Sequence, residues 1–130
     1  MYLLDTDVLV GLLRGNSRVK KNIDENHRIP KAFSIISFGE LLYGCHKSQH
    51  AAENLTQVRR LTSCYPVINI SRPIMERFAE MKAILSRSGV TIEDFDLLIG
   101  CTALTMDYIM VTNNFKHYSK IPGLKIVNWS

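Results

Sequence analysis

Short apolar runs alternate with helical patterns along the whole chain, and this alternation most constrains the fold. The runs have the length of strands and lie at residues 2–4, 33–36, 66–70, 109–111 and 124–127. Strands that are separated by helices pair in parallel, and helices then cover both faces of the sheet. The sequence therefore predicts the α/β fold class, with a central, mostly parallel sheet of about five strands and helices on both faces.

The helical segments are marked by apolar residues at helical spacing and by the residues that start and stop them. This spacing predicts helices over residues 8–13, 17–23, 51–64 and 71–88. The pattern Ser37-x-x-Glu40 is typical of a capping box, so we expect a further helix from Ser37 to about residue 48. Residues 97–104 are almost wholly apolar, which predicts a helix that is buried on most sides.

The length of 130 residues predicts one domain, residues 1–130, that needs no disulfide or structural metal to hold its core. The cysteines Cys45, Cys64 and Cys101 form no CxxC pair, and we interpret them as buried thiols in a reducing compartment. The N-terminus lacks the basic region of a signal peptide, and no apolar run approaches the ~20 residues of a membrane span. We expect a cytoplasmic protein without a membrane partner.

Four acidic residues are predicted to gather at one edge of the sheet. Asp5 ends the first strand, and Glu40 lies in the first turn of the helix after the second. Asp94 and Asp96 open the buried helix before the fourth strand. Each acid alone could simply cap a helix. Together, at the carboxyl ends of parallel strands, they predict a site for Mg²⁺ or Mn²⁺, since a cation relieves the repulsion between clustered carboxylates.

Such a site is suited to the hydrolysis of phosphate esters. A metal ion held by carboxylates can activate a water molecule, neutralise the attacked phosphate and stabilise the leaving oxygen. The polar residues Thr112, Asn113 and Asn114 follow the fourth strand and could orient water or phosphate at the same edge. A simple polar turn explains these three residues equally well.

Four segments, in order, resemble the successive motifs of the PIN-domain ribonucleases, and more narrowly the VapC toxins of bacterial and archaeal toxin–antitoxin pairs. The segments are MYLLDTDVLV (1–10), SIISFGELLYG (34–44), DFDLLIGCTA (94–103) and VTNNF (111–115). The resemblance covers nearly the whole chain and extends to IPGL at 121–124. It implies a single PIN-like nuclease domain with a three-layer fold, and a Mg²⁺- or Mn²⁺-dependent endoribonuclease.

The same resemblance implies which acids act. The family's acidic ligands fall on Asp5, Glu40 and Asp96 of this chain. Family members often carry Asp where this chain has Asn114, which leaves the number of metals open. Asp94 is then the candidate that supplies the missing carboxylate, as a ligand or as a group that orients water.

Supporting residues follow from the same motifs. Asp7 stands where the family usually has Asn, and it adds negative charge beside Asp5. The hydroxyls of Thr6 and Thr112 are expected to support the acids, together with Asn114.

The implied partners are an RNA substrate, with tRNA among the candidates, a cognate VapB-like antitoxin that inhibits the enzyme, and a second copy in a homodimer. Lys and Arg number 16 against 12 Asp and Glu, a net charge of +4 that suits a polyanion without proving one. Candidate contacts to the RNA backbone are Arg14, Arg18, Lys47 and Lys116, with Lys20 and Lys21 also basic.

Two other functions compete with this interpretation. Residues 5–8, Asp-Thr-Asp-Val, also fit the loop of haloacid-dehalogenase-type phosphatases, in which Asp5 would attack phosphorus and Asp7 would act as general acid or base. The last acids of that family should directly follow a strand, whereas Asp94 and Asp96 open a helix. The second alternative is a domain that binds RNA or a protein partner without catalysis, which the amide at Asn114 keeps open.

Overall fold

The computed structural model describes residues 1–129, and its centre is a parallel sheet of five strands in the order β3-β2-β1-β4-β5. The strands are β1 (Tyr2–Leu4), β2 (Lys31–Ser34), β3 (Val67–Ile68), β4 (Ile109–Val111) and β5 (Ile126–Val127). The chain builds outward from β1 to β3 and then crosses back to place β4 on the other side of β1. The winding therefore reverses between β1 and β4, and the predicted fold class is confirmed.

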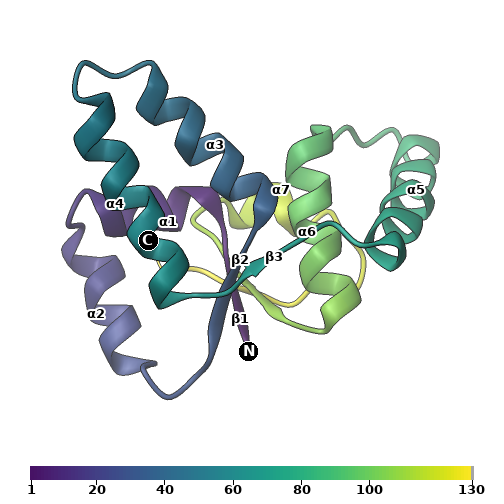
Figure 1. Cartoon of the computed structure of the whole chain (residues 1–130). Coiled ribbons are helices and arrows are strands. Elements are labelled where there is room, and N and C mark those ends of the chain that lie inside the picture. The colour runs from purple at the N-terminus through teal and green to yellow at the C-terminus, as the bar shows by residue number, and fades with distance from the viewer. Residues whose placement is uncertain (130) are drawn as a thin grey trace.

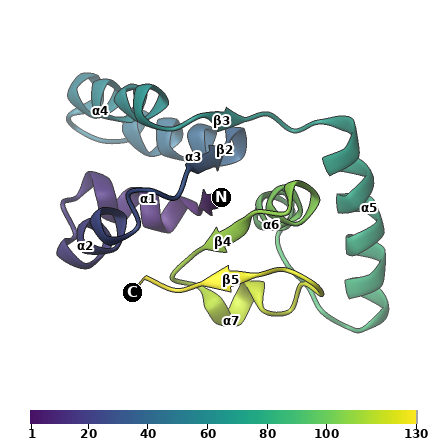
Figure 2. The ribbon, with the colours of Figure 1, turned by 90° about the horizontal axis from the view of Figure 1, so that it is seen from below.

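Helices cover both faces of this sheet. They are α1 (Thr6–Leu13), α2 (Ser17–Glu25), α3 (Ile35–His46), α4 (Ala51–Cys64), α5 (Arg72–Arg87), α6 (Asp94–Met106) and α7 (Phe115–Tyr118). Figures 1 and 2 show α1, α2 and α4 on one side of the sheet and α5 and α6 on the other. Neighbouring strand residues point to opposite faces. Leu3 accordingly packs in the core cluster that contains Ile99 of α6, and Leu4 packs in the one that contains Val58 of α4.

The helix that follows β2 begins earlier than predicted, and the expected capping box is wrong. The strand ends at Ser34, whose side chain caps α3 by accepting from the backbone N of Ile36 at 3.0 Å. Glu40 consequently lies in the second turn of α3, and Ser37 is a fully buried helix residue. This earlier start matters for function because it turns the side chains of Ser37 and Glu40 toward Thr6 of α1.

Other boundaries agree with the sequence or shift by a few residues. The helix predicted over 51–64 is observed with those bounds, and Gly89, with φ +71°, follows the end of α5 as expected. Helix α2 begins at Ser17, and the side chain of Asn16 caps it. The short helix α7 was not predicted. Its four residues lie between a polar turn and Pro122, too short a span to show helical periodicity.

The three cysteines differ in their burial. Cys45 and Cys101 are buried as predicted, but Cys64 is exposed, because it ends α4 on the side away from the core. Within residues 1–129, no helix is long and apolar enough to cross a membrane.

Candidate active site

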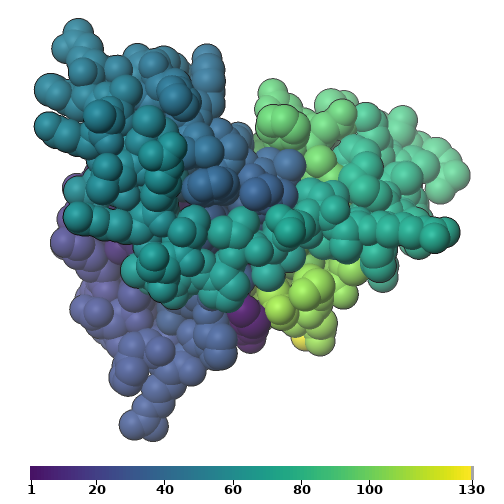
Figure 3. All heavy atoms as spheres, viewed as in Figure 1, coloured from purple at the N-terminus to yellow at the C-terminus, as the bar shows by residue number. Residues whose placement is uncertain are grey.

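The predicted acids meet where the winding of the sheet reverses. Asp5 directly follows β1, and its backbone N donates to the carbonyl of Val111 in β4 at 2.9 Å, which places Asp5 at the end of both strands. Glu40 comes from α3 and Asp96 from α6, and the surface is hollowed between these two helices (Figure 3). The pocket, about 700 Å³ including open solvent, is lined by Asp5, Thr6, Asp7, Val10, Glu40, Asp96, Asn114 and Tyr118.

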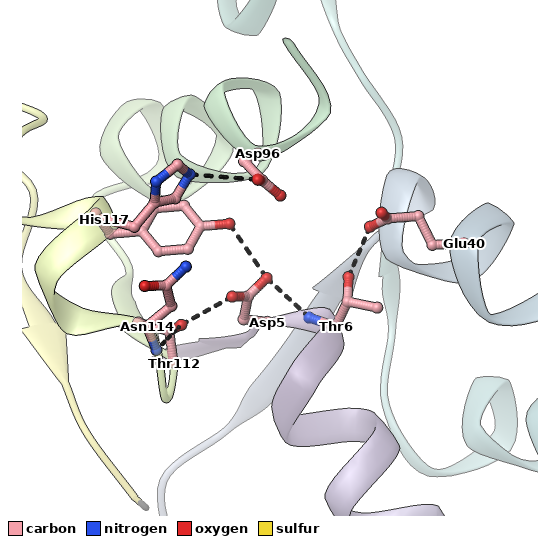
Figure 4. Close-up of polar contacts among 8 residues, drawn as sticks. Asp5, Thr6, Glu40, Asp96, Thr112, Asn114 and His117 are labelled. Atoms are coloured by element: carbon pink, nitrogen blue, oxygen red, sulfur yellow. Dashed lines mark hydrogen bonds and ion pairs between the residues drawn. The ribbon is translucent and has the colours of Figure 1, made fainter. Parts of the chain in front are cut away.

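Asp5 is the most constrained carboxylate of the pocket, and its side chain is only 6% exposed. Its Oδ1 accepts from the backbone N of Thr6 at 2.8 Å and from the hydroxyl of Tyr118 at 3.3 Å. Its Oδ2 accepts from Thr112 Oγ1 at 2.8 Å, so dashed lines converge on Asp5 from three sides in Figure 4. Burial, and next the charge of Asp7, raise the pKa of Asp5 to about 7 despite these donors.

Asp7 lies beside Asp5 in the first turn of α1, and only one of its carboxylate oxygens has a donor. Oδ2 accepts from the backbone N of Asn113 at 3.1 Å. Oδ1 is buried and has no hydrogen-bond partner in the part of the chain that the structure describes. Burial raises the pKa of Asp7, and the charge of Asp96 acts in the same direction. A buried, unpartnered carboxylate oxygen is costly unless a cation or water satisfies it.

The Glu40 carboxylate lines the pocket and is hydrogen-bonded to Thr6. Thr6 Oγ1 donates to Glu40 Oε1 at 2.8 Å and also lies 2.8 Å from the hydroxyl oxygen of Ser37 (Figure 4). Thr6 is the first residue of α1, and its backbone N is the donor to Asp5. One residue therefore links the two carboxylates, which agrees with the expected supporting role of Thr6.

Asp96 faces a histidine that the sequence analysis missed. His117 Nε2 lies 3.3 Å from Asp96 Oδ2, within ion-pair distance (Figure 4). The ring nitrogen is buried and its geometry is unsuited to a hydrogen bond with any described residue, so the contact is a close approach only. His117 and Tyr118 lie three and four residues after Asn114, on the short helix α7. Residues three and four positions apart lie on the same face of a helix. A helical turn predicted after Asn114 would therefore have placed both side chains beside it.

Asp94 does not belong to the pocket, and the prediction that it lies beside Asp96 is wrong. Its Oδ1 pairs with Lys82 Nζ of α5 at 2.8 Å, and both side chains are more than half exposed. It lines a different, shallow depression with Lys82 and Phe95. Residues two positions apart on a helix are separated by about 200°, so Asp94 and Asp96 point in nearly opposite directions.

This difference predicts opposite outcomes for two neighbouring substitutions. Asp94→Asn leaves the RNA cleavage that the family resemblance implies within about threefold of wild type and costs less than about 1 kcal/mol of stability, because its ion pair with Lys82 is exposed. Asp96→Asn, the matched variant two residues away, reduces cleavage by at least roughly 100-fold if it removes a ligand of a catalytic metal. Cleavage rates and urea unfolding measure both. Equal losses in the two variants would contradict the assignment.

The candidate basic residues are not equally close to the pocket. Arg14 lines a groove between α1, α3 and α4 that shares Thr6, Val10 and Glu40 with the acidic pocket. Lys116 lies on α7, two residues after Asn114. Lys47 lies over the ring of Tyr43 at 5.0 Å, beyond the end of α3. Arg18, Lys20 and Lys21 lie on α2, which packs beside α1 and contributes no residue to the pocket lining.

The donor chemistry of the pocket fits a hard divalent cation. Carboxylates of Asp5, Asp7, Glu40 and Asp96 and the amide of Asn114 line or adjoin it, and oxygen atoms are what Mg²⁺ and Mn²⁺ prefer. The raised pKa of Asp5 and the unpartnered Oδ1 of Asp7 both indicate negative charge that lacks compensation. Among residues 1–129, no three acidic, histidine or cysteine side chains are yet close enough to hold one ion. Binding would therefore require some of these side chains to turn toward the ion.

The sequence of this chain is similar to that of known proteins. A family model described as "PIN domain" matches residues 2–123. Ribonuclease VapC2 of Rickettsia felis is 30% identical, over 99% of this chain and 98% of its own length. The tRNA(fMet)-specific endonuclease VapC of Shigella flexneri is 26% identical, over 99% of this chain and 98% of its own.

Solved structures lead to the same family. VapBC2 from Rickettsia felis, bound to a DNA fragment from its promoter, has a chain that is 28% identical with a TM-score of 0.93, covering 99% of this chain and 98% of that one. DNA-bound VapBC from Salmonella typhimurium has a chain that is 25% identical with a TM-score of 0.93, at the same coverage of both chains.

Proposed function

This chain belongs to the PIN-domain family and, within it, to the VapC-type ribonucleases, and from that premise we propose that it cleaves RNA in the acidic pocket between β1 and β4 with a divalent cation. The protein is an endoribonuclease, the toxin of a toxin–antitoxin pair. One observation supports this pocket as the active site: Asp5 is buried where the winding of the sheet reverses, and its pKa is raised to about 7. A bound cation would compensate this charge cluster.

The proposed ligands are Asp5, Glu40 and Asp96. The fourth acid that we propose for the cation site is Asp7 rather than Asp94, because Asp7 Oδ1 is a buried acceptor without a donor in residues 1–129. When bound, Mg²⁺ or Mn²⁺ supplies the Lewis acidity that activates water and neutralises the phosphodiester.

The remaining polar residues hold these acids or meet the substrate. Thr112 donates to Asp5, and Thr6 donates to both Asp5 and Glu40, which keeps the two carboxylates oriented before RNA arrives. The side-chain amide of Asn114, which lines the pocket, can donate to a phosphate oxygen.

The substrate is RNA, and the nearest basic residues suit its backbone. Arg14 in the adjoining groove and Lys116 beside Asn114 are the proposed phosphate contacts, with Arg18 and Lys47 further from the pocket. The Shigella flexneri relative is named for cleavage of tRNA(fMet). We propose a structured RNA of the tRNA class for this chain, in the cytoplasm, where such RNA is found.

The proposed protein partners follow from the structural relatives. Two solved neighbours are DNA-bound VapBC proteins, and a third is a toxin–antitoxin complex from Klebsiella pneumoniae. We propose that a cognate VapB-like antitoxin inhibits this enzyme and that two copies of the chain form a homodimer.

The decisive experiment is cleavage of purified tRNA and of a single-stranded RNA by purified protein, with Mg²⁺, Mn²⁺ or EDTA. We expect cleavage with either cation, a loss of at least roughly 100-fold in EDTA, and recovery when Mn²⁺ is added in excess. Undiminished cleavage in EDTA would contradict a metal mechanism. RNA binding without cleavage at an excess of protein would instead support the non-catalytic alternative.

The phosphatase alternative finds no support. The last acids of that family should directly follow a strand, whereas Asp96 lies in the first turn of α6. The chain also matches a different family along residues 2–123.

A further inference from the structure

Tyr118 is a buried tyrosine whose hydroxyl meets the central carboxylate of the pocket. Its side chain is only 1% exposed and has the largest volume among the fully buried residues. Its hydroxyl donates to Asp5 Oδ1 at 3.3 Å, across 113 positions of sequence. Phenylalanine would fill the same apolar space, so packing alone does not explain the hydroxyl.

The ring of Tyr118 packs against a glycine of α6. A Cβ atom at Gly100 would lie 2.6 Å from Ile121 Cδ1 and 3.5 Å from two ring carbons of Tyr118. Gly inside a helix costs roughly 1 kcal/mol relative to Ala. Here it lets α7 and the following turn approach α6 closely. The position of the hydroxyl is therefore determined by tight packing rather than by a mobile side chain.

Three donors from different parts of the chain surround the Asp5 carboxylate. The backbone N of Thr6 and the hydroxyl of Tyr118 contact Oδ1, while the hydroxyl of Thr112 contacts Oδ2. Thr6 begins α1, Thr112 directly follows β4, and Tyr118 ends α7. Donors on both oxygens resist rotation of the carboxylate about its terminal torsion, which is otherwise soft. Oδ1 accepts two of these hydrogen bonds and Oδ2 accepts one, so Oδ2 retains a lone pair for a further partner.

We propose that Tyr118 is a positioning residue, whose hydroxyl, seated by Gly100, holds the Asp5 carboxylate in the orientation that receives the divalent cation. This inference rests on the proposed function, because it takes Asp5 to be a ligand. In this role the hydroxyl acts on Asp5 rather than directly on the cation or the RNA. It acts by keeping Asp5 pre-organised, so that the cation does not have to fix the torsion on binding.

The test is Tyr118→Phe, which removes the hydroxyl and keeps the ring. Tyr2→Phe is the matched control, since Tyr2 is also a buried tyrosine but packs edge-on against Trp129, away from the pocket. Mn²⁺ binding to the RNA-free proteins is measured by electron paramagnetic resonance or calorimetry. We expect the Mn²⁺ dissociation constant of Tyr118→Phe to rise roughly tenfold, the effect of one hydrogen bond to a charged group. Tyr2→Phe should bind like wild type.

Cleavage provides the second readout. If Tyr118 acts through cation binding, saturating Mn²⁺ restores most of the cleavage that Tyr118→Phe loses at low Mn²⁺. Unchanged Mn²⁺ affinity in Tyr118→Phe would overturn the positioning role while leaving the proposed function intact. RNA cleavage by a wild-type protein that binds no Mn²⁺ would overturn the metal mechanism itself, and the role of Tyr118 with it.

Discussion

Asp5→Asn is expected to reduce RNA cleavage roughly 1,000-fold or more. The metal-free variant is expected to unfold at the same temperature as metal-free wild type or at a higher one. The substitution keeps the shape of the side chain but removes a charge from the position where the proposed cation binds, and metal ions supply several kcal/mol to such reactions. Stability does not fall in parallel, because Asp5 is buried beside Asp7 and its charge is costly when no cation is present. Cleavage assays at saturating Mn²⁺ and calorimetry measure the two effects.

A surface aspartate provides the control for this result. Asp24 is exposed on α2, and Asp24→Asn should leave cleavage and unfolding close to wild type. Asp96→Asn should also lose cleavage, by at least roughly 100-fold. Substantial cleavage by purified Asp5→Asn protein would show that the pocket is not the active site. A large drop in its melting temperature would show that Asp5 has a mainly structural role.

The stability of the metal-free protein is expected to fall as the pH rises from about 4 to about 7. Asp5 has a pKa of about 7 in the folded protein, against an ordinary value of 3.8. Between these values the unfolded chain releases a proton that the folded protein retains, so rising pH favours unfolding, and the loss is complete above the folded pKa. The difference corresponds to about 4 kcal/mol. Burial raises the pKa of Asp7 as well, which acts in the same direction.

Urea unfolding in EDTA between pH 5 and pH 8 measures this dependence. Asp5→Asn should flatten most of it, because the titrating group is gone. Added Mn²⁺ should stabilise wild type more at pH 8 than at pH 5, since a cation and a proton compete for the same carboxylate. Parallel pH profiles for wild type and Asp5→Asn would contradict the assignment of the raised pKa to Asp5.

Much of the site followed from the order of elements. Strands in parallel bring their carboxyl ends to one edge, so residues that follow β1 and β4 had to lie near each other. Asp5 and Thr112 are 107 positions apart, yet they form a 2.8 Å hydrogen bond at that edge. The acids at positions 40 and 96 join the same pocket.

The wrong predictions concern the residue at which α3 begins, the direction in which Asp94 of α6 points, and the short helix α7. The early start of α3 at Ile35 changed the turn on which Glu40 lies, and it made Ser34 the cap instead of Ser37. Asp94 opens the same helix as Asp96 and is predicted to supply the carboxylate missing at Asn114, but one helix cannot turn both acids inward. Helix α7 went unpredicted, and with it His117.

The α/β fold class, the edge at which the acids gather and the family resemblance can be predicted from the sequence alone, because these depend on local periodicity and on short motifs. The acid that lines the pocket with Asp5, Glu40 and Asp96 depends on the folded structure: it is Asp7, with its unpartnered Oδ1, rather than Asp94. The folded structure also decided that Tyr118 reaches Asp5 over 113 positions. The rotation of a helix and the close approach of distant segments, as at Gly100, depend on the packing of the whole core.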